Sequence, residues 1–237
     1  MENNWQRIWK NRDVRNIVDA DVTTNEILDH LLSIDGFDSG TGKILSPNWG
    51  TFIENLINNL KIVKHNSIFE VGCGAGAFLY PFYKNGYEIG GIDFSDNLVK
   101  QCSTLFKNDC FKTCEADHLE VDPAYDFVFS FSVFFYFPDL IYASKVLKLM
   151  IEKAKKAVIV LDIPDLAKQE ECENLRRKQY APGEYDKKYI GLNHLYYSKD
   201  WFREQSRSLK CPDINISDQN IEGYFNSKFR FNCIIKK

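Results

Sequence analysis

The sequence feature that most restricts the fold is an alternation of short apolar runs with amphipathic segments between residues 67 and 163. Apolar runs of strand length alternate with segments of helical spacing: strands are predicted at 67–71, 87–93, 111–116, 125–134 and 156–163, and helices at 77–86, 95–107 and 140–155. Such an alternation predicts an α/β fold with a mostly parallel, doubly wound sheet. The run at 125–134 is almost entirely apolar, as expected for a strand that helices cover on both faces.

The segments on either side of this alternation complete a single domain. Residues 1–62 predict a helical N-terminal cap, with one helix beginning at Ser46 and Pro47. Residues 63–163 form the core. Residues 164–195 are predicted to be an inserted lid, because a charged helix and a Pro-Gly turn interrupt the alternation. Residues 196–237 predict a helix and then two alternating strands, which form an antiparallel pair at the edge of a seven-stranded sheet.

Composition and charge argue against some classes of binding partner. Hydrophobic residues make up 44% and charged residues 27%, as in ordinary globular proteins. The net charge of −3 argues against non-specific binding of nucleic acid, because such binding needs an excess of Lys and Arg. No apolar run approaches the roughly 18–20 residues that cross a bilayer, and the polar start has no signal-peptide core. We therefore expect neither a nucleic acid nor a membrane partner.

The cysteines indicate a reducing compartment. The chain has seven cysteines, an odd number, and it is long enough to be stable without disulfide bonds. Reduced thiols and a cytoplasmic location are therefore expected. Cys110, Cys114 and His118 lie close in sequence, but Cys-x3-Cys is a looser spacing than zinc knuckles use and no fourth ligand is near. We expect no metal site.

A glycine-rich loop follows the first predicted strand. The stretch reads Glu70-Val-Gly72-Cys-Gly74-Ala-Gly76 and precedes a predicted helix. In a doubly wound sheet, ligands bind at the carboxyl ends of the strands, where such a loop offers bare backbone amides beside a helix N-terminus. Dinucleotides usually require G-x-G-x-x-G. The G-x-G-x-G spacing, with an acid before it, favours a different cofactor.

This stretch resembles motif I of the class I S-adenosylmethionine-dependent methyltransferases, which have a Rossmann-like fold. The resemblance implies that Glu70 and the glycines Gly72, Gly74 and Gly76 hold the methionine and ribose part of the cofactor, with Cys73 and Phe94 beside them. It also implies that Asp93, in "GGIDFS", takes both ribose hydroxyls. A carboxylate suits that task because its two oxygens accept two O–H donors.

The resemblance continues through residues 66–163. The family commonly has Asp-Ala-x-x-Leu after its third strand, next to adenine. Here "EADHL" supplies Glu115 and Ala116, with Glu where Asp is usual, and Asp117 is the alternative adenine partner. The stretch "YDFVFSFSVFFYFPD" is similar to the family's fourth strand and its Pro-Asp ending, and places Ser130 near the cofactor.

Two residues are candidates for catalysis on the acceptor. His194 lies where the lid meets the sheet, and histidine suits a general base near neutral pH; the alternative is a buried structural histidine. Tyr136 follows the fourth strand, where many relatives place a polar residue that faces the acceptor. Its neighbours Phe134, Phe135 and Phe137 are either core residues or an aromatic wall.

Two charged or aromatic segments have alternative interpretations. Trp5, Ile8 and Trp9 share one helical face, which either packs on the sheet or forms a flap over the cofactor. Five basic residues in the lid suit an anionic acceptor: Arg176, Arg177, Lys178, Lys187 and Lys188. Acidic residues balance the lid's charge, however, which favours a solvated helix face.

Together these features predict a methyltransferase that forms S-adenosylhomocysteine and methylates an O or N of a small polar metabolite. A sugar, a nucleotide-sugar or a secondary or surface-polysaccharide metabolite fits. The alternatives are an NAD(P)-dependent oxidoreductase and a non-catalytic module that binds S-adenosylmethionine. A monomer or homodimer is expected.

Overall fold

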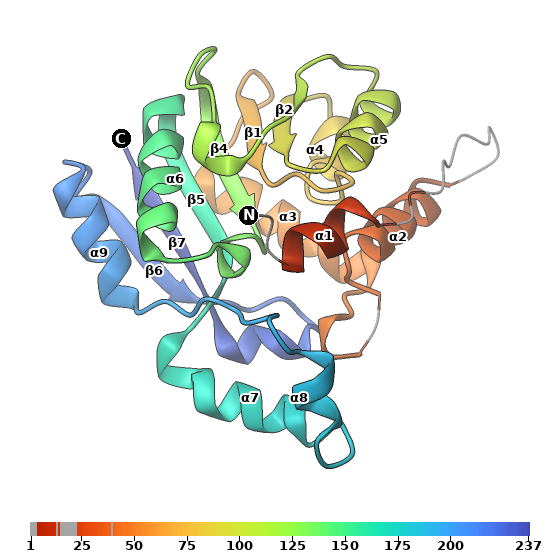
Figure 1. Ribbon diagram of the computed structural model, residues 1–237. Helices are drawn as coiled ribbons and strands as arrows, with labels where there is room; N and C mark the ends of the chain where they lie inside the picture. The colour runs from red at the N-terminus through yellow and green to blue at the C-terminus, as the bar shows by residue number, and fades with distance from the viewer. Residues whose placement is uncertain (1–3, 13, 15–22, 39) are drawn as a thin grey trace.

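A seven-stranded sheet in the order β3-β2-β1-β4-β5-β7-β6 runs through the protein (Figure 1). The computed structural model describes residues 4–12, 14, 23–38 and 40–237. The strands are β1 Ser67–Val71, β2 Glu88–Asp93, β3 Phe111–Thr113, β4 Tyr125–Phe131, β5 Ala154–Pro164, β6 Ile214–Asp218 and β7 Arg230–Lys236. Strands β1 to β5 are parallel, and β7 is antiparallel to both β5 and β6. The predicted fold class is confirmed, including the antiparallel pair at the edge.

Helices cover both faces of this sheet (Figure 1). They are α1 Asn4–Lys10, α2 Thr24–Ile34, α3 Ser46–Leu60, α4 Tyr80–Lys84, α5 Asp96–Phe106, α6 Leu140–Lys153, α7 Gln169–Arg177, α8 Glu184–Lys188 and α9 Lys199–Ser208. Helices α2, α3, α4 and α5 share one apolar cluster with the sheet, and α6 and α9 share the other.

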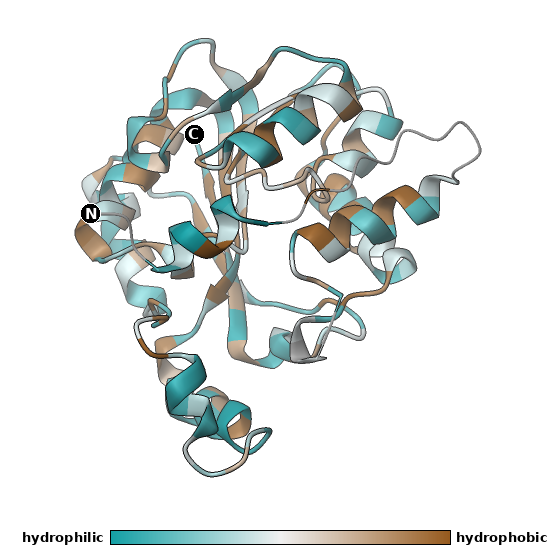
Figure 2. Ribbon diagram, turned by 45° about the vertical axis from the view of Figure 1, so that its right-hand side comes forward, coloured by the Kyte–Doolittle hydropathy of each residue, from teal (hydrophilic) through white to brown (hydrophobic). Residues whose placement is uncertain are grey.

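The alternation of side chains along β4 explains these two clusters. Phe127, Phe129 and Phe131 belong to the cluster with α2 to α5, whereas Val128 belongs to the cluster with α6 and α9. The sheet strands are accordingly largely brown in Figure 2. The side chain of Trp49 is fully buried on the α3 side and packs its ring 4.8 Å from that of Phe131. Because both faces of the sheet are apolar, polar functional side chains are left to the ends of the strands.

Local signals fix several helix boundaries. Thr23 and Glu26 form a capping box at the start of α2, and the Ser198 side chain accepts a hydrogen bond at the start of α9. Helix α3 begins at the predicted Ser46, but its N-cap is Leu45 and makes no side-chain hydrogen bond. Pro47, in the first turn, defines that start instead.

Residues 164–195 leave the sheet after β5 and return at α9. They contain α7 and α8, which project from the body of the molecule and are mainly teal in Figure 2. The boundary of this lid, like the predicted cap over 1–62, stays a prediction. The cap includes residues 1–3, 13, 15–22 and 39, which lie outside the described residues.

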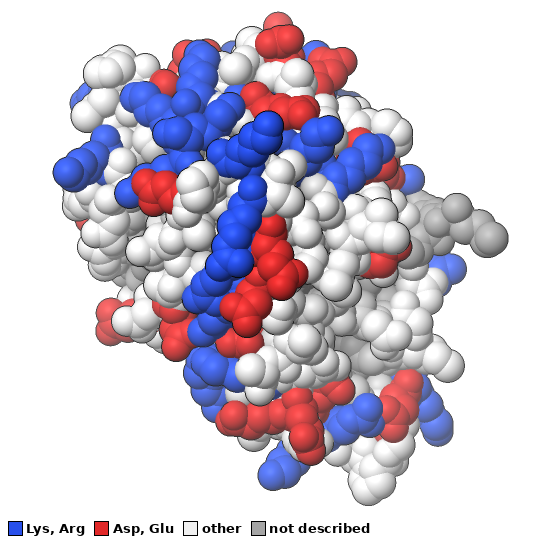
Figure 3. Space-filling view, turned by 90° about the vertical axis from the view of Figure 1, so that its left-hand side faces the viewer, with Lys and Arg blue, Asp and Glu red and all other residues white. Residues whose placement is uncertain are grey.

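The surface carries charges of both signs. On the face shown in Figure 3, Lys and Arg side chains are interspersed with Asp and Glu. Ion pairs such as Lys148–Glu152 on α6 and Arg203–Asp200 on α9 account for part of this pattern. Within the described ranges, no helix is long and apolar enough to cross a membrane.

Candidate active site

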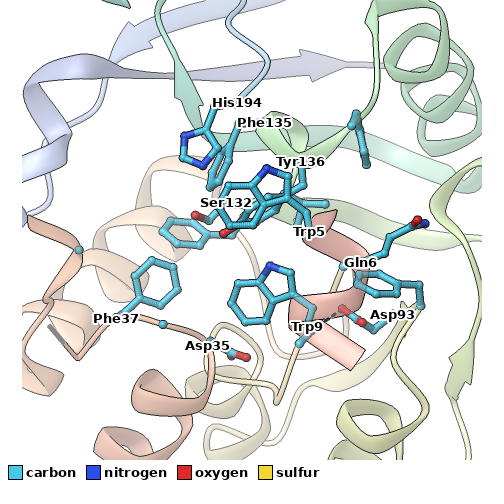
Figure 4. A pocket seen from close by; sticks show the side chains of 18 of the residues that line it. Trp5, Gln6, Trp9, Asp35, Phe37, Asp93, Ser132, Phe135, Tyr136 and His194 are labelled. Carbon is cyan, nitrogen blue, oxygen red and sulfur yellow. Dashed lines mark hydrogen bonds between the residues drawn. The ribbon is translucent and has the colours of Figure 1, made fainter. Parts of the chain in front are cut away.

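A cavity of about 680 Å³ lies at the carboxyl ends of the parallel strands, a size typical of small-molecule sites. Its walls come from the loops after β1, β2, β3 and β4, from α1, and from the lid. Figure 4 shows Asp35, Trp9 and Asp93 on one side of it and His194, Phe135 and Tyr136 on the other, with Trp5 between them. Segments far apart in sequence therefore enclose a single space.

The glycine loop after β1 has a backbone that only glycine adopts easily. The φ angles of Gly72, Gly74 and Gly76 are +79°, +53° and +94°. A Cβ atom on Gly72 would collide with Val133, and one on Gly74 would collide with Asp35. Gly76 faces side chains of α5 and does not line the cavity. The glycines thus allow other parts of the protein to approach this loop closely.

Asp35, just after α2, anchors the glycine loop and was not singled out from the sequence. Its carboxylate accepts hydrogen bonds from the backbone N–H groups of Ala75, at 2.7 Å, and Ala77, at 3.1 Å. Burial raises the pKa of Asp35 to about 7 although these bonds oppose the shift. The residues that it holds are 40 and 42 positions away along the chain, so no local sequence signal marks this role.

Asp93, at the end of β2, lies beside the same loop. Its carboxylate accepts from the backbone N–H groups of Gly74, at 3.0 Å, and Ser95, at 2.9 Å. Burial raises the pKa of Asp93 to about 6. Each carboxylate oxygen keeps a further lone pair, so the group can still accept two hydroxyl donors.

Glu70 supplies a buried acceptor that nothing in the described chain satisfies. The residue is 2% exposed and its Oε2 atom has no hydrogen-bond partner among the described residues. Burial, followed by the charges of Asp35 and Asp93, raises the pKa of Glu70 well above its usual value. A buried acceptor of this kind is costly unless a ligand pairs with it, and a cationic ligand suits it best.

The two acids after β3 are both engaged. The carboxylate of Glu115 accepts from Gln6 Nε2 of α1 at 2.9 and 3.1 Å. Asp117 accepts from Lys145 Nζ of α6 at 2.9 Å. Both residues line the cavity, so Glu115 also ties α1 to the cavity wall.

The serine predicted near the cofactor lies elsewhere. Ser130 in β4 is fully buried, and its Oγ donates to the carbonyl of Val71 at 2.9 Å. The serine that lines the cavity is Ser132, just beyond the strand end, with a φ of +60°. Ser130 points into the sheet because its side chain pairs with the neighbouring strand.

The residues after β4 divide between core and cavity. Phe134 is buried and packs on Tyr197 and Phe202. Tyr136 faces the cavity, with its ring 4.9 Å from that of Trp5 and 5.7 Å from that of Trp9. Of the three phenylalanines, Phe135 and Phe137 line the cavity and Phe134 does not. Burial raises the pKa of Tyr136, so its phenol keeps its proton and is a poor base.

The contacts of His194 fix its tautomer. Its Nδ1 lies 3.0 Å from Arg176 Nη1, and because a guanidinium only donates, Nδ1 is the acceptor. The imidazole proton is then on Nε2, which is buried without a partner among the described residues. Burial and the charges of Arg176 and Arg230 hold the pKa of His194 well below its usual value. This geometry suits a hydrogen-bond donor, not the general base expected from the sequence.

Comparison with solved structures identifies the fold. A methyltransferase from Archaeoglobus fulgidus superposes with a TM-score of 0.61 at 15% identity, covering 87% of this chain and 98% of that one. The magnesium protoporphyrin IX methyltransferase from Synechocystis PCC 6803, with bound S-adenosylhomocysteine, gives 0.60 at 16% identity over 89% and 97%.

One segment of the sequence also matches a family model. Residues 69–150 match the model described as a methyltransferase domain. The chain as a whole has the fold of the methyltransferases on which it superposes. A candidate methyltransferase, 235L of Invertebrate iridescent virus 6, is 28% identical over 81 residues, which are 33% of this chain and 30% of the viral protein. The match thus spans less than a third of that relative.

The fold brings most of the residues predicted for the cofactor to the cavity. Those that line it are Glu70, Gly72, Cys73, Gly74, Asp93, Phe94, Glu115, Ala116 and Asp117. Gly76 and Ser130 do not. The free Oε2 of Glu70 suits a positively charged donor such as the ammonium group of S-adenosylmethionine, and Asp93 suits ribose hydroxyls. Among the residues that the structure describes, no group of His, Cys, Asp or Glu side chains is placed to hold a metal ion.

Proposed function

We propose that this protein transfers the methyl group of S-adenosylmethionine to an oxygen or nitrogen atom of a small molecule. The observation that carries the proposal is the buried carboxyl group of Glu70, whose Oε2 atom has no partner among the described residues and which lines the same cavity as Asp93. S-adenosylmethionine supplies a methyl group that its sulfonium has already activated. The main task of the protein is then to hold the acceptor atom roughly 3 Å from that methyl group.

The described residues suggest how the cofactor is held. We assign Glu70 to the ammonium of the methionine moiety, since its free oxygen needs a donor. Asp93 takes the ribose hydroxyls, and the segment from Glu115 to Asp117 lies beside the adenine. Asp35 holds the glycine loop in the conformation that this placement needs.

The acceptor end is formed by α1, the turn after β4 and the lid. Aromatic rings of Trp5, Phe135 and Tyr136 surround His194 there and exclude water from the reacting atoms. We assign His194 as a donor, through Nε2–H, to the acceptor molecule. A small metabolite fits a cavity of this size.

Ligand binding to the purified protein tests the proposal. S-adenosylhomocysteine should raise the melting temperature, because it binds only the folded state, whereas NAD and NADP should not. The Asp93→Ala variant should bind S-adenosylhomocysteine about 100-fold more weakly, since it loses hydrogen bonds to a charged group. Asp96→Ala is the matched control, because Asp96 is exposed at the start of α5. Stabilisation by NAD alone, or unchanged affinity in Asp93→Ala, would contradict the proposal.

A further inference from the structure

The charged residues that line the cavity separate by sign. The acidic ones come from the ends of α2, β1 and β2 and from the segment after β3: Asp35, Glu70, Asp93, Glu115 and Asp117. The basic ones all come from the lid and from β7: Arg176, Lys188 and Arg230. In Figure 4, Asp35 and His194 mark these opposite sides. The acidic end suits the cationic cofactor, so the basic end needs an explanation of its own.

Arg230 is the most deeply placed of the basic residues. Its side chain is 2% exposed, and its guanidinium carbon lies 5.2 Å from the centre of the Phe135 ring. Its Nε is 3.3 Å from Asp162 Oδ1. Its Nη1 is buried and has no hydrogen-bond partner among the described residues. A buried guanidinium with an unused donor is costly without a ligand.

Asp162 does not occupy the free donors of Arg230. Its Oδ2 accepts from Ser132 Oγ at 2.7 Å and from the Tyr224 hydroxyl at 3.2 Å, and its Oδ1 accepts from Gln219 Nε2 at 2.8 Å. Four groups thus share one carboxylate. Arg230 lines the cavity beside this network with donor capacity to spare.

Arg176 adds a second cation at the same place. It bonds to His194 Nδ1 and has no carboxylate within ion-pair distance in the described part of the chain. Its neighbour Arg177 differs, because it pairs with Asp186 and does not line the cavity. His194 contacts the same Phe135 ring as Arg230, at 4.7 Å between ring centres, and its Nε2–H is also unused.

We infer that the methyl acceptor carries an anionic group, a carboxylate or a phosphate, which binds the guanidinium groups of Arg230 and Arg176 and the Nε2–H of His194. This inference rests on the proposed function and specifies its substrate class. The planar guanidinium group binds carboxylates and phosphates with short, charge-assisted hydrogen bonds. The aromatic rings of Trp5, Phe135 and Tyr136 next to these donors favour a flat apolar body on the same molecule.

Small aromatic probes of matched shape test the inference. Binding of benzoate, phenyl phosphate and the neutral benzamide is measured by calorimetry on protein saturated with S-adenosylhomocysteine. At least one anion should bind about tenfold or more tightly than benzamide, because hydrogen bonds between charged groups are stronger than those to a neutral amide. Which anion binds better identifies the group as carboxylate or phosphate. Equal binding of all three, or no binding of either anion, overturns the inference.

Variants locate the site of anion binding. Arg176→Gln should lose the preference for the anion, whereas Arg177→Gln should keep it, because Arg177 lies outside the cavity. Removing Arg230 alone would leave Asp162 buried without its cation, so Arg230→Gln is combined with Asp162→Asn. An unchanged anion preference in both Arg176→Gln and the double variant would also overturn the inference.

The same experiment separates this inference from the proposed function. The affinity for S-adenosylhomocysteine is measured first in each variant. If the wild-type protein does not bind it, the proposed function fails. If it binds but the anion preference is absent, only the anionic acceptor is wrong.

Discussion

Gly74 lies where the glycine loop meets Asp35, and its backbone has a φ of +53°. The Gly74→Ala variant should lose about 1–3 kcal/mol of stability, because it combines a strained backbone with a collision against the Asp35 carboxylate. It should also bind S-adenosylhomocysteine more weakly. Chemical denaturation and calorimetry measure the two effects.

Gly50 provides the matched control. It lies inside helix α3, and a Cβ atom there would meet nothing within 4 Å. Gly50→Ala should therefore stabilise the protein by about 0.5–1 kcal/mol. If both alanine variants have the same free energy of unfolding as the wild type, the close approach of Asp35 to the loop does not contribute to stability.

Single residues differ in how well sequence alone predicts their place. Glu70 and Asp93 were predicted because each lies at the end of a strand within a local motif. Asp35 was not, since its partners are 40 and 42 positions away along the chain. Ser130 does not line the cavity and Ser132 does, and the strand pattern does not tell which of these two serines reaches it.

At the scale of elements, α1 closes the cavity from the N-terminal side. Trp5 stacks on His194 with ring centres 5.0 Å apart, and its Nε1 donates to the carbonyl of Asn193 at 3.1 Å. Trp5→Ala should raise the rate at which S-adenosylhomocysteine dissociates by roughly two- to tenfold, since an aromatic pair is worth about 0.5–1.5 kcal/mol. Stopped-flow displacement measures this rate.

Ile8→Ala on the same helix is the control, because Ile8 is 40% exposed and does not line the cavity. Its dissociation rate should match that of the wild type. Equal rates in Trp5→Ala and the wild type would mean that α1 packs on the protein without retaining the cofactor.

The lid shows why an element can be predicted while its role is not. The charged helix at α7 was expected, and its balanced charge indicated a solvated face. Arg176 and Arg177 are adjacent, yet a helix turns by about 100° per residue and sends them to different sides. Which side meets the cavity depends on how α7 packs against His194 and the strand ends, and sequence periodicity does not contain that information.

At the scale of the whole molecule, α2, β1 and β2 bring Asp35, Glu70 and Asp93 together. Burial raises the pKa of Asp35 to about 7 and that of Asp93 to about 6, and it raises the pKa of Glu70 as well. A cationic cofactor binds the ionised carboxylates best. The affinity for S-adenosylmethionine should therefore rise as pH increases through about 6 to 7, and calorimetry across this range measures it.

The Asp35→Asn variant tests this coupling through stability. Asp35 has a folded pKa above its unfolded value of 3.8, so between these values the native state binds a proton that the unfolded chain does not. Its contribution to stability is present at low pH and is lost as pH rises towards 7. His194, with a lowered pKa, acts in the opposite direction below pH 6.5, and its effect cancels in the difference between wild type and Asp35→Asn. Relative to the variant, the ligand-free wild type should lose stability between pH about 4 and about 7, and a constant difference across that range would show that Asp35 is ionised throughout.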